Sequence, residues 1–208
     1  DATNYVWAVM PMLGDWIFAI GYMLGGETAA RLINVGFIFI LGWLVRNLVL
    51  WAGGSAIGAR WAVLIFLSTP LTFTEGSTLF IESVWASFVV AGTLAILRSC
   101  STSDTARCEL LVAGLLLGYA LAAKAVTFTI LPVLLLFMII RYRFWYKAVG
   151  LPYLVMGLGL FLVAGSIPYV TAWWLTGNPV FPFFNAVFKS PFYLTNSNFD
   201  TTVMVYGS

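Results

Sequence analysis

The sequence predicts an all-α fold: a polytopic bundle of transmembrane helices with about six spans, plus interfacial helices in the first outer loop. Three observations lead to this prediction. Hydrophobic residues make up 62% of the 208 residues, charged residues only 9%, and the mean hydropathy is +0.98, which lies outside the soluble range. Long apolar runs alternate with short polar stretches, and about 20 apolar residues suffice for one span. The composition therefore indicates an integral membrane protein.

The longest apolar stretch, Leu110–Ile140, predicts a helical hairpin. It contains a single charge, Lys124, near its middle. Basic residues flank it on both sides, with Arg107 before it and Arg141 just after it. If both basic flanks stay on the cytoplasmic side, the chain must cross the membrane twice within this stretch. Two short helices then meet at Ala122–Ala125, and Lys124 lies at the far face.

The other apolar runs complete the expected architecture. Four further spans are expected at Leu32–Trp51, Trp61–Phe73, Thr78–Leu97 and Ala148–Trp174, with a polar turn at Thr74–Ser77. Pro11 and Gly14-Asp15 interrupt the first apolar stretch and Gly25-Gly26 end it, which favours short interfacial or re-entrant helices there. We therefore expect three parts: an outer-face loop at 1–31, a transmembrane domain at 32–174, and at 175–208 a second outer-face loop that begins a missing C-terminal part.

The charges support this topology. Seven cations fall on the side assigned as cytoplasmic: Arg46, Arg60, Arg98, Arg107, Arg141, Arg143 and Lys147. Three fall on the outer side: Arg31, Lys124 and Lys189. Such a bias is what the positive-inside rule uses to orient a membrane protein.

The chain has no His, which excludes a His-based catalytic triad and His-ligated metals or haem. The two cysteines, Cys100 and Cys108, flank a polar loop, and one Cys pair without His is a poor metal site. The sequence therefore demands no metal and no cofactor.

Chemically suggestive residues gather at the predicted outer face. Charges within membrane segments are costly, so they face cavities or pair with each other. Lys124 and Glu82 lie at the outer ends of their helices, where one cavity could hold both. The alternative is that Lys124 only snorkels to the interface and Glu82 only begins a helix. Asp1 precedes an aromatic and polar segment, and a carboxylate there could serve as a general base toward a hydroxyl group.

The spacing of small and rigid residues has plainer explanations. The stretch TGNPVFPFFN, Thr176–Asn185, is interpreted first as a stiff turn at the membrane surface, because its prolines fix the backbone. The pair Gly114 and Gly118 is expected to permit close helix packing.

Five stretches in series resemble polytopic glycosyltransferases of the GT-C fold, the group that includes enzymes similar to dolichyl-phosphate-mannose–protein mannosyltransferases. They are DATNYVWAVMP (Asp1–Pro11), GGETAARLINV (Gly25–Val35), STPLTFTEGSTLFIESVWASFVVAG (Ser68–Gly92), AGLLLGYALAAKAVTF (Ala113–Phe128) and LTGNPVFPFFNAVF (Leu175–Phe188). In the first of these, Val6 stands where the family often has His.

The resemblance implies an inverting enzyme that takes a sugar from a polyprenyl-phosphate donor at the periplasmic face of a bacterial inner membrane. Asp1 would be the catalytic acidic residue of the outer loop, which deprotonates or orients the acceptor hydroxyl. Lys124 would bind the carrier phosphate, and Glu82 would shape the donor pocket. Tyr5 and Asn178, in the first and last of the five stretches, would be further substrate-binding residues.

Two other classes of function remain open. The missing His favours a non-catalytic membrane subunit of a larger complex, and an intramembrane Lys and Glu also suit a transporter fragment. The start at Asp1, without Met or a signal peptide, favours an internal piece of a larger protein. The expected partners are membrane lipid and a lipid-linked sugar, with further membrane subunits an open class, and no nucleic acid is expected.

Overall fold

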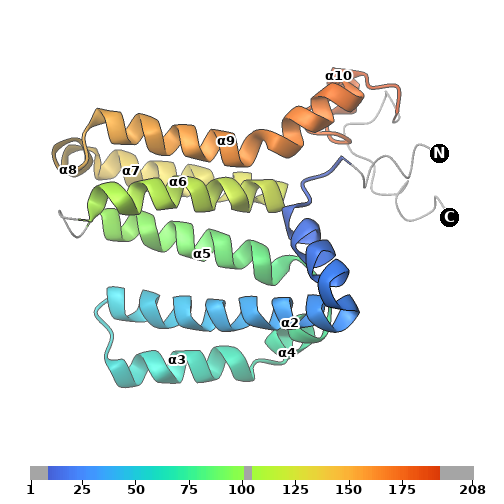
Figure 1. Cartoon of the computed structure of the whole chain (residues 1–208). Coiled ribbons are helices and arrows are strands. Elements are labelled where there is room, and N and C mark those ends of the chain that lie inside the picture. The colour runs from blue at the N-terminus through green and yellow to red at the C-terminus, as the bar shows by residue number, and fades with distance from the viewer. Residues whose placement is uncertain (1–8, 101–104, 193–208) are drawn as a thin grey trace.

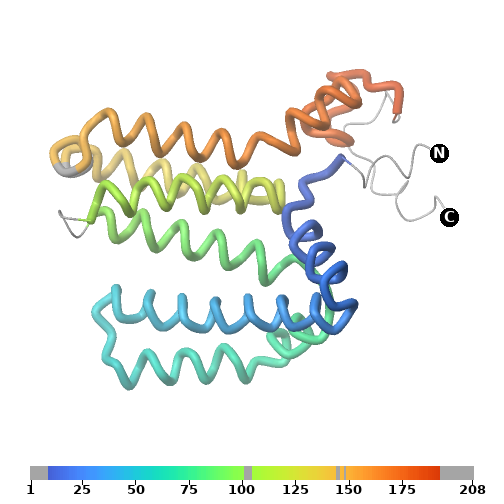
Figure 2. Tube along the Cα trace, viewed as in Figure 1, coloured from blue at the N-terminus to red at the C-terminus, as the bar shows by residue number. Residues whose placement is uncertain are grey.

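The computed structural model describes residues 9–100 and 105–192, and every regular element in these two ranges is a helix. The helices α2 (Leu13–Trp51), α3 (Ala56–Ser68), α5 (Glu82–Ser99), α6 (Ala106–Ala123), α7 (Leu131–Ile140) and α9 (Leu151–Thr176) run side by side (Figures 1 and 2). Shorter helices cover the two ends of this bundle: α4 (Pro70–Ser77), the 3-10 helix η1 (Ala125–Thr129), α8 (Tyr142–Ala148) and α10 (Asn185–Phe188). The predicted all-α bundle is confirmed.

Helix α2 changes direction at Gly25 and Gly26. Gly26 has φ 67° and ψ −162°, a conformation that side chains disfavour, so glycine is required at the bend. The part before the bend crosses the end of the bundle at a steep angle to the part after it (Figure 1). Helix α2 already includes Gly14 and Asp15, where we expected an interruption. An acidic residue in a first helical turn interacts favourably with the helix dipole, so this pair lies at a helix start and does not break it.

Helices α3 and α4 form a pair bent by 58°. The bend lies at Thr69-Pro70, where Thr69 adopts an extended conformation with φ −67° and ψ 130°. A residue before proline avoids the α region, and proline has no N–H to continue the hydrogen-bond ladder. The expected run Trp61–Phe73 is therefore divided at this point, and the expected polar turn at Thr74–Ser77 is the second half of α4.

The centre of the bundle is α6, which packs between α5 and α9. Glycines make the contact with α9 very close: a Cβ on Gly114 would lie 2.2 Å from the carbonyl oxygen of Gly157, and one on Gly118 would lie 2.7 Å from Ala164 Cβ. The packing role expected for Gly114 and Gly118 is confirmed.

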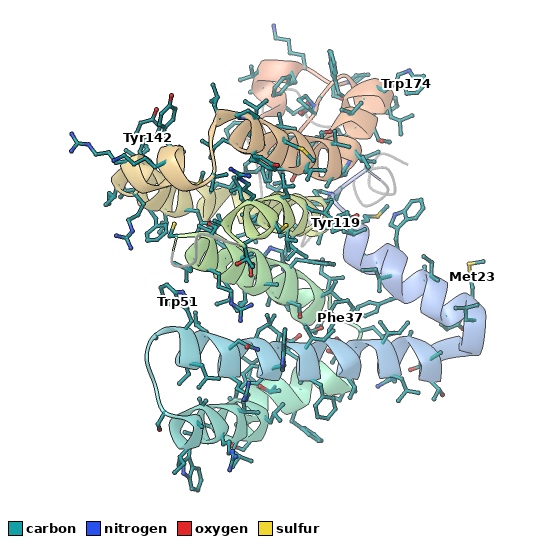
Figure 3. The ribbon with its side chains drawn as sticks, turned by 60° about the vertical axis from the view of Figure 1, so that its left-hand side comes forward. Met23, Phe37, Trp51, Tyr119, Tyr142 and Trp174 are labelled. Atoms are coloured by element: carbon teal, nitrogen blue, oxygen red, sulfur yellow. The ribbon has the colours of Figure 1, made fainter. Side chains whose placement is uncertain are left out.

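Aromatic rings connect the other side of α6 to α5 and α2. Phe88 on α5 lies between Phe37 of α2, at a centroid distance of 6.1 Å, and Tyr119 of α6, at 5.6 Å. Figure 3 labels Phe37 and Tyr119 on either side of α5. These contacts hold α2 and α6 in a fixed relation to the helix between them.

The predicted hairpin at Leu110–Ile140 is present. Helix α6 ends at Ala123, Lys124 is extended with φ −156° and ψ 128°, and η1 leads into α7, which returns alongside α6. The chain thus turns within the predicted Ala122–Ala125 segment.

Three helices of the described part are long and apolar enough to cross a membrane on their own: α2, α6 and α9. The bent pair α3–α4 makes a fourth if it counts as one span. The predicted count of about six spans is not confirmed and stays a prediction, as does the division of the chain at residues 31 and 174.

Large apolar side chains are exposed on the outer faces, such as Met23 and Trp174 at 85% and 87% exposure (Figure 3), which is typical of a surface that meets lipid.

The bundle has two different ends. The basic end carries the α2–α3 connection, the end of α5, the start of α6 and the α7–α8–α9 connection, and with them all seven cations that the sequence assigned to one side (Figure 1). The opposite end, here called the Lys124 end, carries the bend of α2, helix α4, the start of α5, the α6–η1 turn and α10. The fold therefore separates the charges as the sequence predicted.

Candidate functional site

An ion pair marks the Lys124 end. The Nζ atom of Lys124 lies 2.5 Å from Oε1 of Glu82, and the two side chains are 37% and 43% exposed. Glu82 is the first residue of α5, and Lys124 follows the last residue of α6. Because α5 and α6 are antiparallel neighbours, the start of one helix meets the end of the other, and the two charges come together.

A hydrogen-bonded frame fixes the turn that carries Lys124. Trp85 Nε1 donates to Thr127 Oγ1 at 2.8 Å, and this buried hydroxyl also lies 2.9 Å from the carbonyl oxygen of Ala120. The Nζ atom of Lys124 lies 5.9 Å from the centre of the Trp85 ring, within cation–π range. The lysine is therefore positioned by its surroundings and not simply extended into solvent.

Lys124 lines a cavity of about 500 Å³. Its wall is formed by Met10, Pro11, Met12, Asp15, Ile81, Ala123, Lys124, Ala125, Val126 and Phe183. A second charged side chain, that of Asp15, is part of the same wall. The cavity therefore has two charged residues of opposite sign, Lys124 and Asp15, in an otherwise apolar wall.

A buried asparagine supports the α4–α5 corner from which Glu82 extends. Asn34 of α2 is fully buried, and its Nδ2 donates to the carbonyl oxygens of Glu75 at 2.6 Å and of Thr78 at 2.7 Å. Its Oδ1 accepts a hydrogen bond from Ser83 Oγ. One side chain thus joins α2, α4 and α5 immediately beside Glu82.

The corner has a second, more exposed support. Arg31 pairs with Glu27 at 2.6 Å, four residues before it on the same helix, and also donates to the carbonyl oxygen of Ser77. Sequence reasoning did not identify Asn34, Trp85 or Thr127 as site residues. The available signal for Asn34 was an amide near the start of the apolar run Leu32–Trp51.

The other predicted site residues, Asp1, Tyr5 and Asn178, are not found in the wall of this cavity in the described part of the chain. Asp1 and Tyr5 lie outside the described residues. Asn178 is fully buried inside the turn after α9, where its Nδ2 donates to the carbonyl oxygen of Phe183 at 2.9 Å and its Oδ1 accepts from Val180 N at 3.0 Å. These bonds stabilise the turn itself, and a substrate-binding role for Asn178 stays a prediction.

A second, apolar cavity adjoins the charged one. It has a volume of about 380 Å³ and lies between the first part of α2 and helices α6 and α9, with Trp16, Tyr119 and Ile167 in its wall. Met10 and Met12 line both cavities. A cation beside an apolar groove is an arrangement suited to an amphiphile with an anionic head group.

The fold and these cavities define the class: an integral membrane protein of packed apolar helices, with a charged cavity at one end of the bundle. The family model described as dolichyl-phosphate-mannose-protein mannosyltransferase matches residues 5–186. The chain therefore belongs to this family of membrane glycosyltransferases, which confirms the resemblance found in the sequence. No curated protein and no solved structure matches the chain.

Proposed function

We propose that this protein is an inverting GT-C-type glycosyltransferase. It transfers a sugar from a polyprenyl-phosphate donor to a lipid-linked or surface acceptor at the periplasmic face of a bacterial inner membrane. The observation that carries the proposal is Lys124, held beside Glu82 in the wall of a cavity that adjoins an apolar groove. The two parts of such a donor match this arrangement: its anionic phosphate suits the cation, and its apolar chain suits the groove. The family implies a lipid-linked sugar of this kind.

The reaction divides into bond formation and bond cleavage at one carbon. The acceptor oxygen attacks the anomeric carbon of the sugar and loses its proton to Asp1, which acts as general base. The bond between that carbon and the phosphate oxygen breaks, and its electron pair stays on the polyprenyl phosphate. Charge grows on the departing phosphate, so a fixed cation next to it stabilises the transition state more than the ground state.

The ammonium group of Lys124 has further N–H groups with which it can bind a phosphate. An ammonium group carries three N–H donors, and the pair with Glu82 uses one of them. Its side chain is 37% exposed, so a phosphate oxygen can approach it from the cavity. Glu82 and the Trp85 ring keep the ammonium group in place before the donor arrives.

The test uses the full chain in lipid nanodiscs and a labelled polyprenyl-phosphate mannose. Release of polyprenyl phosphate is measured for Lys124→Ala and for Lys147→Ala, which removes the same charge at the basic end. We expect Lys124→Ala to lower the release rate by about 100-fold or more, the usual effect of deleting a transition-state donor, and Lys147→Ala to leave it unchanged. Equal rates in both variants would contradict the proposed role of Lys124, and no release by the unmodified protein would favour a non-catalytic membrane subunit.

A further inference from the structure

The basic end carries a compact surface of cations and tyrosines that the proposed reaction does not use. The α8 patch consists of Arg141, Tyr142, Arg143, Tyr146 and Lys147, and all five side chains are exposed. The rings of Tyr142 and Tyr146 lie 6.0 Å apart on one face of α8. In Figure 3 Tyr142 projects away from the bundle.

The positive charge of the α8 patch is not neutralised within the described part of the chain. The ion pairs found there involve Arg31 and Lys124, both at the opposite end. Among the described residues the acid at the basic end is Glu109, in the first turn of α6, and it forms no ion pair with the patch. Arg107 adds a further exposed cation at this end, 5.0 Å from the centre of the Tyr153 ring.

The position of α8 points to a membrane surface as its partner. Helix α8 is seen nearly end-on in Figure 1 while α7 and α9 run across the view, so it lies across the end of the bundle. The chain then turns back through Val149, which is buried, and Gly150, whose φ of 83° favours glycine. A short basic and aromatic helix across the end of the spans matches the geometry of a helix that rests in the membrane interface.

The patch continues directly into an apolar exterior. Ile139 and Ile140, at the end of α7, are 61% and 72% exposed, and Leu151 and Val155, at the start of α9, are 60% and 61% exposed. The apolar surface that faces lipid therefore borders directly on the cations of the α8 patch. Arginine and lysine at that level meet phosphate head groups, and tyrosine is favoured at the same depth.

We propose that the α8 patch is a binding site for anionic phospholipid head groups of the leaflet at the basic end. The lipid phosphate would contact Arg141, Arg143 and Lys147, and its acyl chains would lie along the exposed faces of α7 and α9. The site is independent of the sugar donor, which the proposed reaction binds at the opposite end.

The test compares two double variants, each of which removes two positive charges at the same end of the bundle. Arg141→Gln/Arg143→Gln changes the α8 patch, and Arg46→Gln/Arg60→Gln changes exposed cations on α2 and α3. The full chain is placed in nanodiscs with equal amounts of phosphatidylglycerol and phosphatidylcholine, and the retained lipids are counted by native mass spectrometry. Lys147→Gln serves as a milder third variant, and thermal unfolding in detergent verifies that each protein is folded.

We expect the unmodified protein to retain phosphatidylglycerol over phosphatidylcholine. We expect the α8 double variant to lose about fivefold or more of this preference, the size expected for removing basic residues at an anionic surface, while the α2–α3 variant keeps it. Equal losses in both double variants would show that any cations at this end attract anionic lipid equally well, which would overturn the proposal. Displacement of the lipid by inorganic phosphate, beyond that caused by chloride of equal ionic strength, would also overturn it.

Discussion

The two ends of the bundle use charge in opposite ways. At the Lys124 end, charges of both signs lie together: Lys124 pairs with Glu82, and Lys124 and Asp15 line the same cavity. At the basic end, cations predominate and spread over the surface, and the α8 patch forms no ion pair with an acidic residue in the described part of the chain.

This difference distinguishes a reaction site from a surface that orients a protein. Charges that pair inside a cavity are held at fixed positions, which a reaction requires. Charges of one sign at the ends of apolar helices act together on a membrane and do not depend on precise placement. The following predictions test this contrast, from the largest expected effect to the smallest.

The largest effect is expected on turnover when the proposed base is changed. Asp1→Asn should lower the rate of sugar transfer by about 10²- to 10⁴-fold, because a positioned general base contributes that much. Arg141→Gln/Arg143→Gln at the basic end should change the rate less than twofold, as its cations touch no reacting atom. Both are measured with the labelled donor under saturating conditions. An Asp1→Asn protein that keeps more than a tenth of the rate would refute the assignment of the base.

The next largest effect is expected on the free energy of unfolding when two asparagines of α2 are each replaced by alanine. Asn34, at the Lys124 end, is fully buried and bonded to three partners, whereas Asn47, at the basic end, is partly exposed and bonds to Trp43 and Arg98. Asn34→Ala leaves buried groups unpaired and should lower the free energy of unfolding by about 1–3 kcal/mol. Asn47→Ala should lower it by less than about 1 kcal/mol, since water can replace the lost partners.

Unfolding in mixed micelles, followed by circular dichroism, measures both asparagine variants. Similar losses would mean that the α4–α5 corner does not depend on Asn34. A loss in Asn34→Ala should also reduce turnover, because the corner carries Glu82, while Asn47→Ala should leave turnover intact.

A smaller effect is expected from Glu82→Gln on stability. Both side chains of the ion pair are more than one third exposed, so screening by solvent keeps its contribution below about 1 kcal/mol. Thermal unfolding in detergent should therefore show a small decrease. A decrease as large as that of Asn34→Ala would show that the ion pair is a structural support of the fold and would weaken the proposed role of Lys124 in catalysis.

The smallest effect is expected from Arg46→Gln/Arg60→Gln. Both side chains are exposed at the basic end, and exposed substitutions of this kind change the free energy of unfolding by about 0.5 kcal/mol or less. Turnover should also be unchanged. A marked loss of stability would show that cations at this end form structural contacts and would remove the contrast between the two ends.

The fold class, the hairpin and the Lys124–Glu82 pair were predictable because each depends on a local pattern. Apolar run length indicates the helices, flanking charge indicates the hairpin, and isolated charges in apolar runs tend to find each other. The partners of Asn34 were not predictable: they lie 41 to 49 residues away, and nothing in the neighbouring residues identifies them. The helix through Gly14 and Asp15 was missed because the same pair suits both a break and a helix start.

The most direct test of the central claim is to exchange the two charges of the ion pair. The double variant Lys124→Glu/Glu82→Lys keeps a pair between the same helices, so its thermal stability should be close to that of the unmodified protein. If Lys124 binds the donor phosphate, the exchange moves the cation out of position and introduces a carboxylate where the phosphate binds. Release of polyprenyl phosphate from labelled polyprenyl-phosphate mannose should then fall about 100-fold or more. A double variant that is stable and also turns over at the normal rate would show that the pair serves only the fold and would contradict the proposed site.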